Sequence, residues 1–217
     1  MGHRPHLFVS GPWLEPVIES SPGTIDHLDR ILRIRSGDAV SYTDGAGMVG
    51  DGVWESSLLL RGPERRVSQP VPALTMAVAV PKSIDRQRFV VEKLGELGVA
   101  RLCWLDAKFG SGHPRKQDKT RTWAVGALEQ SRGAYLLEVG GLVRWDELER
   151  PLLVALPGTD PLAALAIPPS LTVAIGPEGG FAATEIPADA LPVGLGSTVL
   201  RVETAAVVAA AVLLARS

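Results

Sequence analysis

The spacing of apolar positions changes near residue 70. Before it, short apolar stretches alternate with turns, and Val40–Thr43, Asp44–Gly47 and Met48–Trp54 have the pattern of a β-hairpin. Thr24 is a suitable N-cap for a short helix whose apolar residues recur every three or four positions, at Ile25, Leu28, Ile31 and Leu32. Residues 1–69 therefore predict a small, mostly β module of barrel type.

Strands and helices alternate after residue 70. Pro63, Pro70 and Pro72 predict a stiff linker, because proline fixes φ and disfavours helix before it. Apolar runs predict strands at Leu74–Val80, Arg101–Leu105, Leu152–Leu156, Leu171–Ile175 and Pro192–Leu195. Helical spacing predicts helices at Asp85–Leu97, Gln117–Arg132, Asp146–Glu149 and Glu203–Arg216. This alternation over 70–217 predicts a parallel α/β sheet covered on both faces.

Composition places the chain among ordinary globular proteins, with 46% hydrophobic and 21% charged residues. A single cysteine, Cys103, cannot form an internal disulfide, which favours a reducing cytoplasm, and its apolar strand predicts a core position. The first residues lack the apolar core of a signal peptide, and the longest apolar stretch, Ala205–Ala215, is shorter than the about 20 residues a membrane span needs. We expect a cytoplasmic protein without a membrane segment.

The net charge of −2 hides an uneven distribution. Residues 71–150 carry 13 basic and 10 acidic side chains, whereas residues 151–217 carry 2 and 5. Any contact with nucleic acid would therefore involve a local basic patch and not the chain as a whole.

Three loops rich in glycine or proline follow predicted strands in the last third of the chain. They are Leu156-Pro157-Gly158, Gly176-Pro177-Glu178-Gly179-Gly180 and Gly194-Leu195-Gly196. Ligands of open parallel sheets bind beyond the carboxyl ends of the strands, and glycine lets the backbone approach a ligand closely. One such loop alone would be explained as a tight turn, but three together favour a ligand site.

Missing motifs narrow the class of ligand. The α/β part of the sequence, residues 70–217, has no GxGxxG, and the whole sequence has no GxxxxGK[ST] and no GxSxG. Its four histidines and one cysteine do not form a zinc pattern. We therefore expect no metal. A site built mainly from glycine-rich backbone suits a neutral or zwitterionic ligand such as S-adenosylmethionine (SAM) better than a polyphosphate.

The last third also carries a specific motif. Ile175–Phe181, Glu185, Leu195-Gly196 and Val199–Ala205 resemble the pattern GPEGG…E…LG…ILRxETA of the RsmE family of 16S ribosomal RNA (uracil-1498-N3) methyltransferases, which belong to the SPOUT class. Weaker family segments occur in the expected order at His27–Asp38, Pro81-Lys82, Glu92–Val99 and Glu129–Arg132. The chain departs from the family in a shortened stretch around Gly110–Gln117, and in Trp104, Leu137 and Pro187.

The resemblance implies a fold and an activity. It implies a PUA-like RNA-binding β-barrel at 1–69 and a trefoil-knotted SPOUT methyltransferase domain at 70–217. It also implies a homodimer with the closing helix in its interface, SAM as cofactor, and the 16S rRNA or the small ribosomal subunit as partner. The expected reaction is methylation of N3 of a uridine at family position 1498.

The expected cofactor-binding residues combine the three loops with the family motif. They are Leu156, Pro157, Gly158, Ile175, Gly176, Pro177, Glu178, Gly179, Gly180, Leu195, Gly196, Val199 and Leu200. Arg4, Arg30, Arg33, Arg35, Lys82, Arg86 and Arg132 are the expected RNA-binding residues.

Arg201 and Glu178 are the expected catalytic residues. Arg201 would stabilise the negative charge on a uracil oxygen, and Glu178 would position or deprotonate the base. Simpler explanations stay open: Arg201 could pair with Glu203, Glu178 could be a turn carboxylate, and Lys93 and Glu96 could be only a surface pair. Two other functions also stay open, a SPOUT methyltransferase for another RNA such as tRNA and a non-catalytic RNA-binding protein.

Overall fold

The computed structural model describes residues 4–19 and 34–215, and the chain divides into two compact units. Unit 1 comprises Met1–Gln69 and Leu128–Leu136, and unit 2 comprises Pro70–Ala127 and Leu137–Ser217. Residues 128–136 belong to the second domain in the division predicted from sequence, whereas the structure groups them with unit 1. The reason is backbone hydrogen bonding, since Gly47 N donates to Ala134 O at 2.9 Å and Leu136 N donates to Gly45 O at 2.9 Å.

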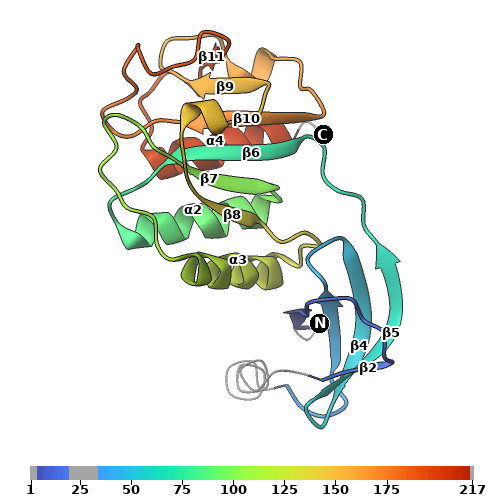
Figure 1. Cartoon of the computed structure of the whole chain (residues 1–217). Helices are drawn as coiled ribbons and strands as arrows, with labels where there is room; N and C mark the ends of the chain where they lie inside the picture. The colour runs from blue at the N-terminus through green and yellow to red at the C-terminus, as the bar shows by residue number, and fades with distance from the viewer. Residues whose placement is uncertain (1–3, 20–33, 216–217) are drawn as a thin grey trace. The chain divides into compact units, whose positions relative to one another are not determined.

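Unit 1 contains a curled five-stranded sheet in the order β1-β3-β4-β5-β2 (Figure 1). Its strands are β1 His6–Phe8, β2 Val17–Glu19, β3 Ala39–Thr43, β4 Met48–Glu55 and β5 Leu58–Arg66. The strands β1 and β3 are parallel, and the other neighbours are antiparallel. The predicted hairpin corresponds to β3 and β4. The helix expected from Thr24 through Leu32 lies outside the described residues.

The sequence predicts that Pro63 belongs to a linker, but in the structure it lies inside β5. The pairing of β4 with β5 is irregular here, since Gly50 pairs with Glu64 and Gly52 with Arg61. Proline cannot donate a hydrogen bond to a sheet, and an irregular register tolerates one. The strand therefore runs through a residue that ends most strands.

Unit 2 is built on a six-stranded parallel sheet in the order β11-β9-β10-β6-β7-β8. Its strands are β6 Ala73–Ala79, β7 Arg101–Leu105, β8 Glu138–Val143, β9 Leu152–Ala155, β10 Ser170–Ile175 and β11 Leu191–Val193. The helices are α2 Ile84–Leu97, α3 Gln117–Ser131 and α4 Val202–Leu214, and the end of α3 from Leu128 onward belongs to unit 1. The 3-10 turns are η2 Trp145–Glu147 and η3 Leu162–Ala164.

Helices cover one face of this sheet, where α4 packs against α2, β6 and β10. On the other face Ala77 and Leu105 pack with Leu148, Trp145 and Phe181, which lie in or beside η2 and in the loop after β10. The sheet is therefore covered on both faces, by helices on one face and by loops and the 3-10 turn η2 on the other. The helix expected at Asp146–Glu149 is only the 3-10 turn η2.

One face of α4 is buried within the chain itself. Ala206, Ala209, Ala210 and Leu213 are fully buried within the chain itself. They pack against α2 and the sheet. Val207, Val208, Ala211 and Val212 on the other face of α4 are only partly buried, so the expected place of this helix in a dimer interface stays a prediction.

Cys103 is 3% exposed at the centre of β7, as its apolar strand predicts. Burial raises the pKa of its thiol, because the charged thiolate is poorly solvated there. In the described part of the chain, no helix is both long and apolar enough to cross a membrane.

Candidate cofactor site

The three glycine-rich loops lie together because their strands are neighbours. The strands β11, β9 and β10 are consecutive in the sheet and parallel, so their carboxyl ends lie at one edge. The segments that follow them surround a cavity of about 390 Å³, which we call the cofactor cavity. It is lined by Ala155, Leu156, Pro157, Ile175, Gly176, Pro177, Glu178, Gly179, Gly180, Phe181, Leu195, Gly196, Thr198, Val199, Leu200, Arg201, Val202 and Ala205.

All the expected cofactor-binding residues except Gly158 line this cavity. The lining also includes Ala155, Phe181, Thr198, Val202 and Ala205, which the sequence analysis did not select. They lie next to selected positions, at strand ends and in the first turn of α4, and extending each motif by a few residues would have found most of them.

Glycine is required at particular places around the cavity. Gly180 and Gly196 have φ values of 72° and 136°, which L side chains rarely adopt, and no other group lies within 4 Å of where their Cβ atoms would be. At Gly176 an added Cβ would lie 3.1 Å from the ring of Phe181. The loops thus keep their backbone uncovered.

Backbone hydrogen bonds connect the segment after β9 with the segment after β11. Gly194 N donates to Asp160 O at 2.7 Å, and Leu162 N donates to Gly194 O at 2.9 Å. A Cβ on Gly194 would lie 2.5 Å from the carbonyl oxygen of Thr159, so the two segments are close enough to exclude any side chain there. Two walls of the cavity are therefore held in fixed positions.

Arg201 is the N-cap residue of α4 and is exposed at the cavity. It forms no ion pair with any other residue that the structure describes. Glu203, the partner considered in the sequence analysis, instead lies 3.5 Å from Nε of Arg86 on α2. The guanidinium of Arg201 is therefore available to a ligand.

Glu178 is not a free turn carboxylate, because Arg86 Nη1 donates to its Oε1 at 3.3 Å. Arg86 thus contacts two carboxylates, Glu178 in the loop after β10 and Glu203 at the start of α4. Arg86 is one of the residues expected to bind RNA, and the wide spacing of Arg86, Glu178 and Glu203 in the sequence gives no sign of this bridge.

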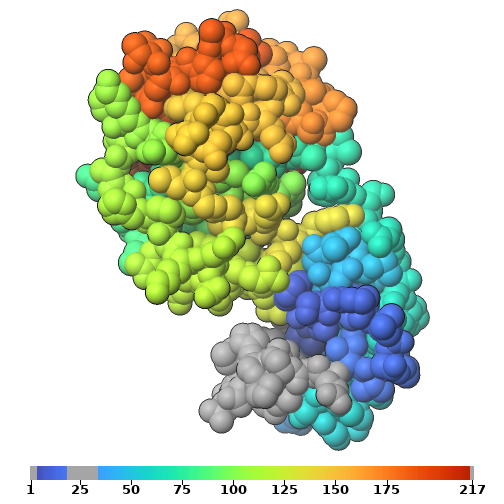
Figure 2. Space-filling view, in the orientation of Figure 1, coloured from blue at the N-terminus to red at the C-terminus, as the bar shows by residue number. Residues whose placement is uncertain are grey.

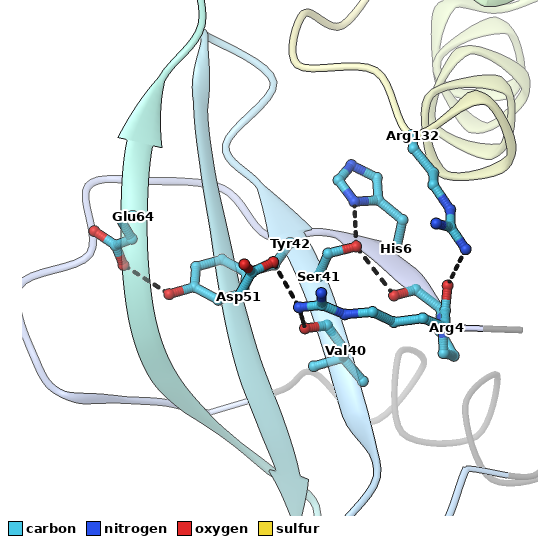
Figure 3. Close-up of polar contacts among 9 residues, drawn as sticks. Arg4, His6, Val40, Ser41, Tyr42, Asp51, Glu64 and Arg132 are labelled. Carbon is cyan, nitrogen blue, oxygen red and sulfur yellow. Dashed lines mark hydrogen bonds and ion pairs between the residues drawn. The ribbon is translucent and has the colours of Figure 1, made fainter. Parts of the chain in front are cut away.

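The other expected RNA-binding residues are spread over both units. In unit 1, Arg4 donates to Val40 O at 2.6 Å and pairs with Asp51, while Arg132 Nη2 donates to the carbonyl of Arg4 at 2.7 Å (Figure 3). Both side chains therefore have structural partners. Arg35 and Lys82 are exposed, and Arg30 and Arg33 lie outside the described residues. Lys93 and Glu96 form the surface ion pair that their spacing suggests, at 2.7 Å.

The chain is similar to known proteins over most of its length. Residues 67–214 match the family model of an RNA methyltransferase domain. The ribosomal RNA small subunit methyltransferase E of Mycobacterium bovis is 32% identical over 216 residues, with 84% of this chain and 80% of that protein covered. The protein of the same name from Synechocystis is 26% identical over 91% of this chain and 73% of its own length.

Solved structures have the same fold. A Legionella pneumophila protein solved with bound SAM is 26% identical, with a TM-score of 0.86 over 99% of this chain and 98% of its own. The SAM-bound ribosomal RNA small subunit methyltransferase E of Neisseria gonorrhoeae has a TM-score of 0.84 over 96% of each chain at 20% identity. The PUA-like sheet and the parallel SPOUT-type sheet are thus a shared architecture. The chain belongs to the ribosomal RNA small subunit methyltransferase E family, and its C-terminal part is an RNA methyltransferase domain.

Proposed function

We propose that this chain methylates N3 of a uridine in 16S rRNA, at family position 1498, with SAM bound in the cofactor cavity. Methylation of rRNA with SAM is the activity of the family to which the chain belongs. To this we add the methylated base, a uridine, the methylated atom, N3, and the position in the rRNA. The observation that supports the proposal most is the cavity itself, since it brings the three loops together with Arg201 and Glu178.

The residues of the cavity fit SAM. Its volume of about 390 Å³ lies in the range of small-molecule sites. Its lining is mostly apolar, and the glycines leave backbone groups uncovered for hydrogen bonds to adenine and ribose. Glu178 contributes the single acidic side chain of the lining, which suits a ligand that carries a positively charged sulfur.

When bound, SAM supplies an electrophilic methyl group. The uracil N3 must lose its proton to attack that group, and the negative charge then spreads to the uracil oxygens. Glu178 is held by Arg86 and accepts the hydrogen bond or the proton from N3. The guanidinium of Arg201 stabilises the uracil oxygen, because it lines the cavity without a competing carboxylate among the described residues. The loops contribute by holding the reacting groups in place.

The assembly and the surroundings of the reaction belong to the same proposal. We expect the trefoil knot of the SPOUT class in the C-terminal domain, and a homodimer as in the family pattern. The substrate is 16S rRNA or the small subunit, which places the reaction in the cytoplasm. The mechanism requires no metal.

The test is mass spectrometry of rRNA from a strain that lacks the gene. We expect one N3-methyluridine to be lost from 16S rRNA and restored by the wild-type gene, but not by a gene encoding Arg201→Ala. Loss of a methylated nucleoside from tRNA instead would contradict the assignment of the substrate. Unchanged RNA together with failure of the purified protein to bind SAM would support a non-catalytic RNA-binding protein.

A further inference from the structure

The loop Ala107–Lys116 connects β7 to α3. It does not line the cofactor cavity and takes no part in the proposed chemistry. It begins at the carboxyl end of β7, at the same edge of the sheet as the cofactor loops. Figures 1 and 2 show it at the surface, in green, beside the red-orange segment that follows β10. We call it the β7–α3 loop.

Phe109 in this loop is 52% exposed, although it is a large apolar side chain. It lies next to the cofactor cavity, because a Cβ added to Gly179 would be 3.3 Å from the Cβ of Phe109. An aromatic ring beside a site can serve as a stacking surface for a nucleobase. The ring therefore stands at the rim of the cavity with one side uncovered.

The loop is fixed at its first end by a carboxylate. Lys108 N donates to Glu185 Oε2 at 2.8 Å, and Ala182 N donates to Glu185 Oε1 at 2.6 Å, so one side chain connects this loop with the loop after β10. Gly110 N closes a turn by donating to Ala107 O at 2.8 Å. Phe109 sits within that turn.

A buried amide fixes the second end. Gln87 of α2 is 1% exposed, and its Nε2 donates to Pro81 O at 2.8 Å and to His113 O at 3.0 Å. Its Oε1 accepts from Arg115 N at 3.2 Å. A loop held at both ends presents Phe109 in a set position, which reduces the entropy lost on binding.

The charge of the loop indicates what it binds. Residues 107–116 contain three basic side chains and no acidic one. Lys108, Arg115 and Lys116 are exposed, and none of them pairs with a carboxylate of another described residue. The Lys108 ammonium lies 5.8 Å from the centre of the Phe109 ring. An aromatic ring with adjacent cations matches the base and the phosphates of a single-stranded nucleotide.

We propose that the β7–α3 loop binds the RNA substrate, with Phe109 stacked on an unpaired nucleobase next to the methylated uridine and Lys108, Arg115 and Lys116 contacting phosphates. This rests on the proposed function, because it takes the ligand beside the cavity to be RNA. Phe109 is a positioning residue in this arrangement and does not touch the reacting atoms. The loop thereby selects the RNA sequence whose uridine is placed next to the methyl group.

The test compares Phe109→Ala and Phe109→Tyr in the full chain, with an RNA oligonucleotide covering the segment of 16S rRNA around the methylated uridine. We expect Phe109→Ala to raise the Kd for RNA by about tenfold, and Phe109→Tyr to bind like wild type because it retains a stacking ring. The Kd for SAM, measured by calorimetry, should stay unchanged. Leu142→Ala, which removes an apolar side chain 50% exposed on β8, is the matched control and should not change RNA binding.

A second variant tests the charges without changing the ring. Arg115→Gln combined with Lys116→Gln should weaken RNA binding and flatten its logarithmic salt dependence by about 1.4, since each phosphate contact on a single strand contributes about 0.7. An unchanged RNA Kd in Phe109→Ala, or an unchanged salt slope in the double variant, would overturn the inference. If the wild type binds RNA but methylates none, the proposed function fails, and the binding comparison still decides the role of the loop.

Discussion

The two charged residues of the cofactor cavity, Glu178 and Arg201, differ in whether an oppositely charged side chain is paired with them. Glu178 is paired with Arg86, and the same arginine also meets Glu203, so these groups form a small network that holds the loop after β10 against α2 and α4. Arg201 has no carboxylate partner among the residues that the structure describes. Its guanidinium can therefore respond to charge that develops on a substrate.

We predict that Arg201→Ala lowers the rate of single-turnover methylation by about 10²–10³-fold, because it removes a group that stabilises charge mainly in the transition state. The Kd for SAM and the Tm should change little. Arg201→Lys should recover only a small part of the rate, since an ammonium lacks the planar fork of the guanidinium.

Arg88→Ala is the control for this prediction, because Arg88 is an exposed arginine of α2 that pairs with Glu92, at 2.7 Å, and does not line the cofactor cavity. It should leave the rate unchanged. A destabilised Arg201→Ala protein with full activity per folded molecule would show that this arginine is structural.

A second prediction at this scale concerns His6 in unit 1. Its Nδ1 forms a hydrogen bond of 2.8 Å with the Ser41 hydroxyl (Figure 3). Its Nε2 lies 3.1 Å from the carbonyl oxygen of Gly133, which accepts a hydrogen bond from it when this nitrogen carries the proton. Burial lowers the pKa of His6 from 6.5, with smaller contributions from the charges of Arg132 and Arg4. The folded state therefore prefers the neutral imidazole.

A lowered pKa makes stability depend on pH in one direction. The contribution of His6 to the free energy of unfolding is fully present above pH 6.5. It is lost as the pH falls from 6.5 toward the lowered pKa of the folded state, because the unfolded chain then binds the proton more strongly. The Tm of the wild type should fall between pH 7.5 and 5.5, and that of His6→Asn should fall less. Equal decreases in the two proteins would contradict this origin of the pH dependence.

At the scale of elements, the cofactor cavity depends on the order of three strands. Because β11, β9 and β10 are neighbours, segments separated by many residues in sequence end at one edge of the sheet. The backbone of these segments, and not a set of long side chains, forms most of the wall. Substituting a glycine there changes the shape of the site directly.

We predict that Gly196→Val abolishes measurable SAM binding while the far-UV circular dichroism stays that of the wild type. The φ value of 136° at Gly196 is strained for a β-branched residue, and the new side chain would enter the open space of the cavity. Calorimetry measures the binding. Gly141→Val on β8 is the control, because that glycine has ordinary φ and open space around its Cβ position, so SAM affinity should be retained. Normal affinity in Gly196→Val would mean that the ligand binds elsewhere.

Elements with strong apolar runs were predictable from sequence. The strands β6, β7 and β10 and the helices α2, α3 and α4 start and end within two residues of the predicted bounds, because they form the buried centre of unit 2. β8 was missed, since Gly140 and Gly141 weaken the strand pattern at the edge of the sheet. β5 was missed because Pro63 interrupts it.

The candidate site, too, could be predicted only in part from the sequence. Its loops could be selected from glycine content and strand ends, because both are local properties of the sequence. The bridge from Arg86 to Glu178 joins residues 92 positions apart, and the contact of Glu185 with Lys108 N spans 77 positions. Pairings of this kind depend on tertiary packing, which local patterns do not record.

At the scale of the whole molecule, we predict that the chain is a homodimer at micromolar concentration. The buried alanines of α4 do not support this, but other apolar side chains of unit 2 are left in water: Ile84 and Phe89 on α2 are 46% and 41% exposed, and Val199 beside the cavity is 83% exposed. A second copy that covered them would remove apolar surface from water. Light scattering should give twice the chain mass of 23.0 kDa. A monomer at that concentration would contradict the prediction.

The burial of Cys103 has a practical consequence for spectroscopy. The chain has one cysteine, and its thiol is both enclosed and held in the unreactive protonated form. Maleimide dyes should therefore leave the native protein unlabelled at neutral pH. A cysteine introduced at the exposed Ser111 would be the single reactive thiol, so a fluorophore could be attached to the β7–α3 loop without first removing a native cysteine. The emission of that dye would then follow the arrival of RNA in real time.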